Sequence, residues 1–231
     1  METDKILGHL GRMSYRVPNS IIGARVVLAF VASGLFVQGS RGAAVAAVVL
    51  TVLVIGMDAL DGIAARRLGL SSTLGGILDI AADRIVENVY WITFAVVQRV
   101  PLWVPLVIVT RSVLVDAVRG LALVQGRTAF GDSTMARSRL TRFLTASRAM
   151  RSAYGVAKVA AFVLLGTLVA LGDPPAGEVA AIAPSAVGVL ETTATAAVVV
   201  AVALCVARGI PVILDGVAYL DPKRDLSATS G

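Results

Sequence analysis

The stretch that decides the fold runs from residue 58 to residue 83 and reads DALDGIAARRLGLSSTLGGILDIAAD. Two pairs of aspartates stand in it, spaced three and four residues apart, within an otherwise apolar sequence. A carboxylate is costly to bury in such surroundings unless something compensates its charge. The two pairs therefore point to a function rather than to packing.

Helix geometry places each pair of aspartates on one face, because positions i, i+3 and i+4 of an α-helix are neighbours. Asp58 and Asp61 project from one predicted helix, and Asp79 and Asp83 project from the next. The segment 68–73 predicts the turn between them, since it offers a glycine stop followed by serine caps. At a rise of about 1.5 Å per residue, the two pairs lie at similar distances from this turn along two antiparallel helices. The sequence therefore predicts that all four carboxylates meet.

A cluster of carboxylates repels itself unless cations neutralise it. Acidic ligands that offer only oxygen favour a hard metal, so Mg²⁺ or Mn²⁺ is the expected occupant. We expect one or two ions, with two as the preferred number. One histidine, His9, and one cysteine, Cys205, are too few for a zinc site of the usual kind.

The aspartates and the residues around them resemble the signature of the CDP-alcohol phosphotransferase family. In that signature, Asp-x-x-Asp-Gly-x-x-Ala-Arg is followed, after eight residues, by Gly-x-x-x-Asp-x-x-x-Asp. Every fixed position is present here: Asp58, Asp61, Gly62, Ala65, Arg66, Gly75, Asp79 and Asp83. The resemblance implies a membrane-embedded transferase that moves a phosphatidyl group from CDP-diacylglycerol to an alcohol hydroxyl and releases CMP.

The resemblance also implies roles for these residues. The expected metal ligands are Asp58, Asp61, Asp79 and Asp83, with Asp83 also the catalytic base on the acceptor hydroxyl. The expected nucleotide-binding residues are Gly62, Ala65, Arg66 and Gly75. Taken singly, the small residues are also explained by helix packing, and Arg66 by interfacial snorkelling.

The composition indicates a membrane protein, because the 231 residues are 57% hydrophobic and only 16% charged. We expect an all-α, polytopic fold with six transmembrane helices. Apolar runs predict these helices at about 18–38, 43–68, 73–97, 101–125, 153–172 and 188–207, the last with an extension past Pro211 as an alternative. Residues 1–17 mix charge with apolar side chains, which is typical of an interfacial amphipathic helix.

The expected domain organisation is therefore an interfacial segment at 1–17, one catalytic domain at 18–219 and a C-terminal tail at 220–231. Lysine and arginine gather near the N-terminus, at 66–67, at 127–151 and near the C-terminus, whereas the intervening connections are poor in them. By the positive-inside rule, both termini and the aspartates face the cytoplasm of an inner or plasma membrane. The net charge of +6 then indicates contact with anionic lipid head groups rather than with nucleic acid.

The acceptor alcohol is less well marked in the sequence. Arg111 and Arg119 lie eight residues apart on one predicted helix face, and Arg148 precedes the next predicted span. Converging basic side chains favour an acceptor that carries a phosphate. Alternatively, Arg111 pairs with an acid such as Asp116, and the basic loop serves only membrane topology.

Several further positions resemble the phosphatidylglycerolphosphate synthase branch of the family. They are Pro18-Asn19 followed by Arg25, the spacing of Trp103 and Arg111, and Tyr154-Gly155 with Lys158. The pair Asp83-Arg84 departs from that branch and also occurs in the inositol-phosphate branch. Glycerol 3-phosphate is therefore the first candidate acceptor, and inositol phosphate, serine or another alcohol are alternatives. A cation-coupled transporter is the alternative from another class, and the sequence leaves open whether the chain forms a homodimer.

Overall fold

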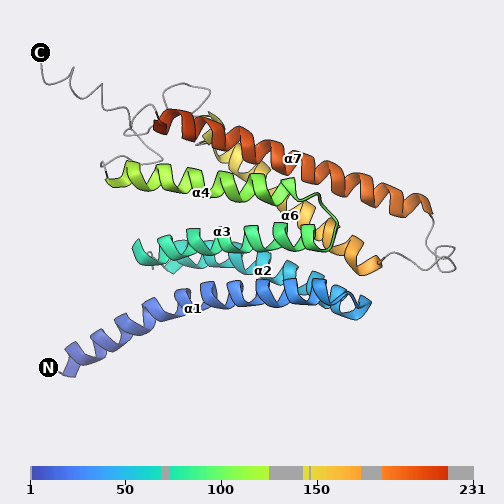
Figure 1. Ribbon diagram of the computed structural model, residues 1–231. Coiled ribbons are helices and arrows are strands. Elements are labelled where there is room, and N and C mark those ends of the chain that lie inside the picture. Colours follow the sequence, from blue (N-terminus) through green and yellow to red (C-terminus); the bar gives the residue numbers. More distant parts are fainter. Residues whose placement is uncertain (1, 69–72, 125–142, 146, 173–183, 218–231) are drawn as a thin grey trace, which may run out of the picture. The chain divides into compact units, whose positions relative to one another are not determined.

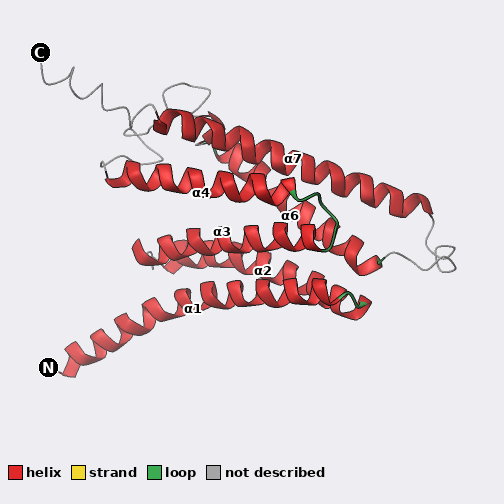
Figure 2. Cartoon of the chain, viewed as in Figure 1, coloured by secondary structure: helices red, strands yellow, loops and turns green. Residues whose placement is uncertain are grey.

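The computed structural model describes residues 2–68, 73–124, 143–145, 147–172 and 184–217, with the backbone alone at 2–19, 59–68, 73–74, 122–124, 184 and 217. Across this part of the chain the secondary structure is helical and no strand occurs (Figure 2). The long helices are α1 (Glu2–Gln38), α2 (Arg41–Leu68), α3 (Thr73–Val96), α4 (Trp103–Val124), α6 (Arg148–Leu171) and α7 (Pro184–Val217) (Figure 1). The predicted all-α class is confirmed.

Four helical segments are long and apolar enough to cross a membrane. They are Ser20–Gln38, Arg41–Asp58, Arg148–Leu171 and Ser185–Gly216. Helices α3 and α4 fall outside this set because charged residues recur along both of them. The apolar segments indicate a membrane protein, while the full set of six spans stays a prediction.

Local signals explain where several helices begin and end. Ser40 caps α2, since its Oγ accepts a hydrogen bond from the Ala43 N–H at 3.3 Å. Gly39 and Gly172 follow the last residues of α1 and α6 with φ angles of 79° and 69°, a left-handed conformation that glycine adopts without strain. The helices predicted at 43–68, 73–97 and 101–125 are confirmed to within two residues at each boundary.

The observed bounds of three helices differ from the main predictions. Helix α6 begins at Arg148, five residues before the predicted start at 153, because Ser147 caps it by accepting a 3.1 Å hydrogen bond from the Met150 N–H. Helix α7 extends from Pro184 to Val217 and passes through Pro211, as the longer alternative predicted. Helix α1 continues from Glu2 to Gln38 without a break at residue 18. A proline removes a single helical hydrogen bond, which a long helix can tolerate.

The chain divides into two compact units, residues 1–102 with 162–194 and residues 103–161 with 195–231. In the first unit α1 packs against both α2 and α3 (Figure 1). Small side chains line this packing and let the backbones approach closely. The alanines of α1 and α2 that are at most 1% exposed are Ala29, Ala32, Ala44 and Ala47.

An aromatic cluster completes the core of the first unit. It consists of Phe36, Tyr90, Trp91, Phe94 and Phe162, which are at most 2% exposed. Neighbouring rings in it have centroids 5.0 to 6.3 Å apart. Phe36 also touches the backbone of α6 at Gly166, where a Cβ atom would lie 3.0 Å from the ring.

In the second unit, helix α7 lies close to α4 at two glycines. A Cβ atom at Gly209 would lie 2.6 Å from Cγ of Arg111, and one at Gly216 would clash with Val118. Glycine is therefore required at both positions for this packing.

Candidate active site

Three of the predicted aspartates come together in the first unit. Asp58 lies in α2, and Asp79 and Asp83 lie one turn apart on α3. One carboxylate oxygen from each lies within 4.8 Å of the others. The prediction that carboxylates from the two helices meet is therefore confirmed for these three residues, while the side chain of Asp61 lies outside the described residues.

The three carboxylates remain accessible. Their side chains are 52% exposed at Asp58, 47% at Asp79 and 48% at Asp83. A dense group of negative charges at an accessible position favours binding of a cation. We refer to Asp58, Asp79 and Asp83 as the acidic cluster.

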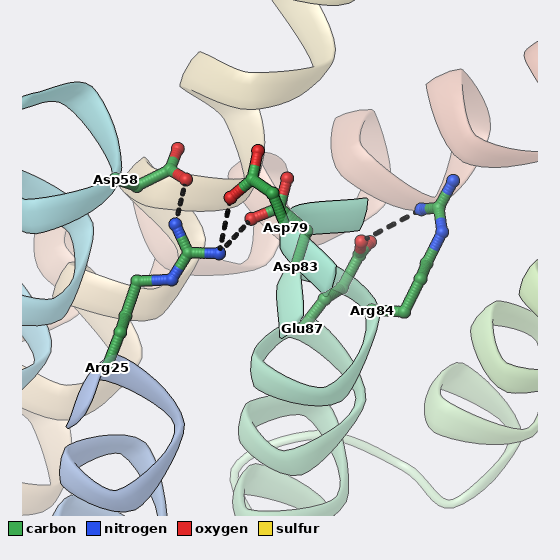
Figure 3. Close-up of polar contacts among 6 residues, drawn as sticks. All are labelled: Arg25, Asp58, Asp79, Asp83, Arg84 and Glu87. Carbon is green, nitrogen blue, oxygen red and sulfur yellow. Dashed lines mark hydrogen bonds and ion pairs between the residues drawn. The ribbon is translucent and has the colours of Figure 1, made fainter. Parts of the chain in front are cut away.

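Arg25 of α1 lies against the acidic cluster, and its side chain is only 1% exposed (Figure 3). Its Nη2 donates hydrogen bonds to Oδ1 of Asp83 at 2.7 Å and to Oδ1 of Asp79 at 3.4 Å. Its Nη1 donates to Oδ1 of Asp58 on the other side. One guanidinium group therefore joins α1 to α2 and α3 through three carboxylates.

From the sequence, Arg25 was only one of the residues that resemble a family branch, and no role in the site was predicted for it. A signal was available, because Arg25 is the only charged residue between Ser20 and Gln38. An ionisable side chain inside an apolar span usually has a partner and a function. Its partners lie 33 to 58 residues away in the sequence, so the pairing itself could not be read from α1.

A second ion pair lies beside the acidic cluster on α3. Arg84 Nη1 is 3.3 Å from Oε2 of Glu87, whose side chain is 2% exposed. Figure 3 shows this pair on the side of α3 that is turned away from Arg25. Glu87 is therefore engaged elsewhere, although it follows Asp83 at helical spacing.

The remaining motif residues lie on α2 and α3. The side chains of Asp61, Gly62, Ala65 and Arg66 lie outside the described part of α2, whose backbone is helical at these positions. Gly75 lies in the first turn of α3 and is half-buried. The helical backbone places Asp61 one turn beyond Asp58, as the spacing predicted.

The predicted acceptor-binding arginines belong to the second unit. Arg111 and Arg119 lie on α4, the first buried and the second half-buried, and Arg148 is exposed at the start of α6. The Nε atom of Arg111 has no hydrogen-bond partner among the described residues. A buried guanidinium with an open donor is suited to bind an anion.

Two further basic residues lie near a single aromatic ring in this unit. The Arg208 guanidinium lies 5.9 Å from the ring centre of Tyr154, and Lys158 Nζ lies 5.7 Å from it. Both distances are in the range of cation–π interactions. Arg208 is adjacent in sequence to Gly209, against which Arg111 packs.

Comparison with known protein families identifies the chain. The family model for CDP-alcohol phosphatidyltransferase matches residues 15–218, which include all the described helices except the first part of α1. The chain belongs to the CDP-alcohol phosphatidyltransferase family. This phosphatidyltransferase is therefore an enzyme of phospholipid biosynthesis that transfers a phosphatidyl group from a CDP-alcohol donor to an alcohol.

Members of the family need a divalent metal ion. The residues of this phosphatidyltransferase fit such an ion, since the acidic cluster offers hard oxygen ligands at short mutual distances.

Proposed function

We propose that this phosphatidyltransferase transfers the phosphatidyl group of CDP-diacylglycerol to a small phosphorylated polyol, with glycerol 3-phosphate as the first candidate, and releases CMP. The observation that carries the proposal is the meeting of Asp58, Asp79 and Asp83 from two helices, with one oxygen of each within 4.8 Å. Family membership supports the donor chemistry.

Four aspartates, Asp58, Asp61, Asp79 and Asp83, would hold Mg²⁺ or Mn²⁺, preferably as two ions. A bound divalent ion would neutralise the donor diphosphate and stabilise the departing oxygen. Asp83 accepts the proton of the acceptor hydroxyl as that oxygen bonds to phosphorus and the bond to the CMP oxygen breaks. The half-exposed side chain of Asp83 supports this role, since a base must reach its substrate.

The residues between the two aspartate pairs would bind the donor nucleotide. Gly62 and Ala65 on α2 and Gly75 on α3 leave room for a nucleotide against the helices, and Arg66 binds the diphosphate. The accessible acidic cluster supports this assignment, because the same two helices would carry the metal and the nucleotide.

The acceptor phosphate is assigned to Arg111, Arg119 and Arg148. The open Nε donor of buried Arg111 supports the first of them most directly. Arg208 and Lys158 add positive charge to the same unit. A charge-assisted hydrogen bond to a phosphate is stronger than one to a neutral hydroxyl, which favours glycerol 3-phosphate or inositol phosphate over serine.

The membrane arrangement that accompanies this function has six spans, both termini and the acidic cluster on the cytoplasmic side, an interfacial segment at 1–17 and a tail at 220–231. The apolar segments support a membrane location, and the distribution of lysine and arginine supports the orientation. A homodimer is compatible with this arrangement. Membership of a transferase family favours the enzyme over the cation-coupled transporter.

The test is release of CMP from CDP-diacylglycerol by the purified chain in detergent. Glycerol 3-phosphate, inositol phosphate, free inositol and serine would be compared as acceptors, each with Mg²⁺, with Mn²⁺ and with EDTA. We expect metal-dependent release of CMP that is fastest with glycerol 3-phosphate. Full turnover in EDTA would contradict the metal assignment, and preference for an acceptor without phosphate would contradict the acceptor assignment alone.

A further inference from the structure

Arg25 is buried to 99% in an apolar helix, yet it is paired with three accessible carboxylates (Figure 3). A lone arginine in such a helix is costly, so its burial depends on the acids that neutralise it. The acids depend on Arg25 in turn, because Asp58, Asp79 and Asp83 repel one another at these distances. The two partners therefore stabilise each other when no other cation is bound.

The contacts also involve the atoms that a metal would use. Arg25 engages Oδ1 of each of the three carboxylates. A divalent ion at the acidic cluster would either share these carboxylates with Arg25 or displace it from some of them. In both cases the fixed positive charge opposes the incoming cation.

We propose that Arg25 is a positioning residue that assembles the acidic cluster before metal binds and lowers the affinity of the cluster for the metal. The inference rests on the proposed function, since it assumes that the acidic cluster is the metal site. It gives Arg25 two effects of opposite sign. Arg25 stabilises the metal-free protein, and it weakens metal binding.

The test uses the full-length protein in detergent with Mn²⁺ alone, without donor or acceptor. Free Mn²⁺ is measured from its electron paramagnetic resonance signal during titration, and thermal unfolding is measured in EDTA. For Arg25→Gln we expect a lower unfolding temperature in EDTA and a dissociation constant for Mn²⁺ lower by about tenfold or more. Arg25→Lys keeps the charge with fewer donors, so both of its values should lie between those of Arg25→Gln and the wild type.

Two further variants serve as controls for the effect of Arg25→Gln on stability and on Mn²⁺ affinity. Arg41→Gln removes an exposed arginine at the start of α2 and should change neither quantity. Arg25→Gln with Asp83→Asn removes one charge of each sign, so it should recover part of the unfolding temperature that Arg25→Gln loses. If Arg25→Gln alone does not fold, the unfolding temperature of this double variant and both measurements on Arg25→Lys still test the inference.

The possible outcomes separate the hypotheses. If Arg25→Gln binds Mn²⁺ more weakly than the wild type, Arg25 only supports the structure, and the inference is wrong. Unchanged affinity and unchanged stability would also overturn the inference. If the wild type and all variants fail to bind Mn²⁺, the proposed metal site fails as well, whereas normal binding that Arg25 does not affect leaves the proposed function intact.

Discussion

The side chain of Arg111 on α4 packs directly against Gly209 on α7. A Cβ atom at Gly209 would lie 2.6 Å from Cγ and 2.9 Å from Nε of Arg111, so the guanidinium is held where only glycine fits opposite it. Arg111 is buried, and its Nε has no hydrogen-bond partner among the described residues. This close approach makes the position of Arg111 sensitive to a change on a different helix.

The first prediction concerns acceptor binding. Replacing Arg111, Arg119 or Arg148 with alanine should raise the acceptor KM about tenfold to hundredfold and change the KM for the CDP-lipid little, because a charge-assisted hydrogen bond contributes about 1.5 to 3 kcal/mol. Steady-state kinetics with glycerol 3-phosphate would measure the change, with Arg41→Ala as a control for loss of charge. Equal loss for every substrate would show that these arginines only support the fold.

The second prediction uses the contact between Gly209 and Arg111. Gly209→Ala should displace the Arg111 side chain and raise the acceptor KM, while the CDP-lipid KM stays near the wild-type value. Gly188→Ala is the matched control, since it adds the same methyl group to α7 at a position with nothing within 4 Å. If Gly209→Ala leaves the acceptor KM unchanged, the guanidinium of Arg111 does not bind the acceptor in this position.

The third prediction concerns the metal ligands. Asp58→Asn, Asp61→Asn and Asp79→Asn should each lower kcat/KM by on the order of a hundredfold or more, because each removes a charge from the metal site. Each variant should also need more Mn²⁺ to reach half of its maximal rate. A variant that keeps full activity at the wild-type Mn²⁺ requirement would remove that residue from the set of ligands.

The fourth prediction separates the base from the ligands. Asp83→Asn should lower kcat by about 10² or more while largely keeping binding of the CDP-lipid, because loss of a general base affects proton transfer more than donor affinity. Binding would be measured as protection against thermal unfolding by CDP-diacylglycerol in Mn²⁺. Asp79→Asn serves as the comparison, since it should lose both properties. If the two variants behave alike, Asp83 is chiefly a metal ligand.

The fifth prediction concerns stability. Gly166→Ala should destabilise the protein by about 1 to 3 kcal/mol, because the added methyl would lie 3.0 Å from the Phe36 ring and 3.2 Å from Cγ2 of Val48. Gly34→Ala has nothing within 4 Å and should be neutral or stabilising by up to about 1 kcal/mol. Thermal unfolding in detergent would compare the two, and a similar unfolding temperature for both would mean that the core accommodates the methyl.

Helices were the most predictable part of the fold, because long apolar runs leave few alternatives. The start of α6 was missed because the arginines at 148 and 151 look like a loop, whereas Ser147 caps a helix there. The continuity of α1 through Pro18 was missed because a proline usually marks a boundary. At Ser147 a local hydrogen bond outweighs the average preference of the residues that follow it.

The parts of the site that are close together in the sequence could be predicted from it. Asp79 and Asp83 share a helical face by spacing alone, and the motif adds Asp58. The approach of Arg25 depends on how α1 packs against α2 and α3, and no spacing within one helix encodes that packing. The proximity of Arg111 to Gly209 is of the same kind, since the two residues lie on different helices.

The aromatic cluster has a consequence for the surroundings of the acidic cluster. Phe36 on α1 and Phe94 on α3 each lie eleven residues beyond Arg25 and Asp83, or about 16 Å along the helices. The rings around them are almost completely buried and form a closely packed apolar layer in the first unit. A charged, accessible site can thus lie next to a dry apolar layer in the same unit, and that layer opposes the movement of protons and ions along these two helices.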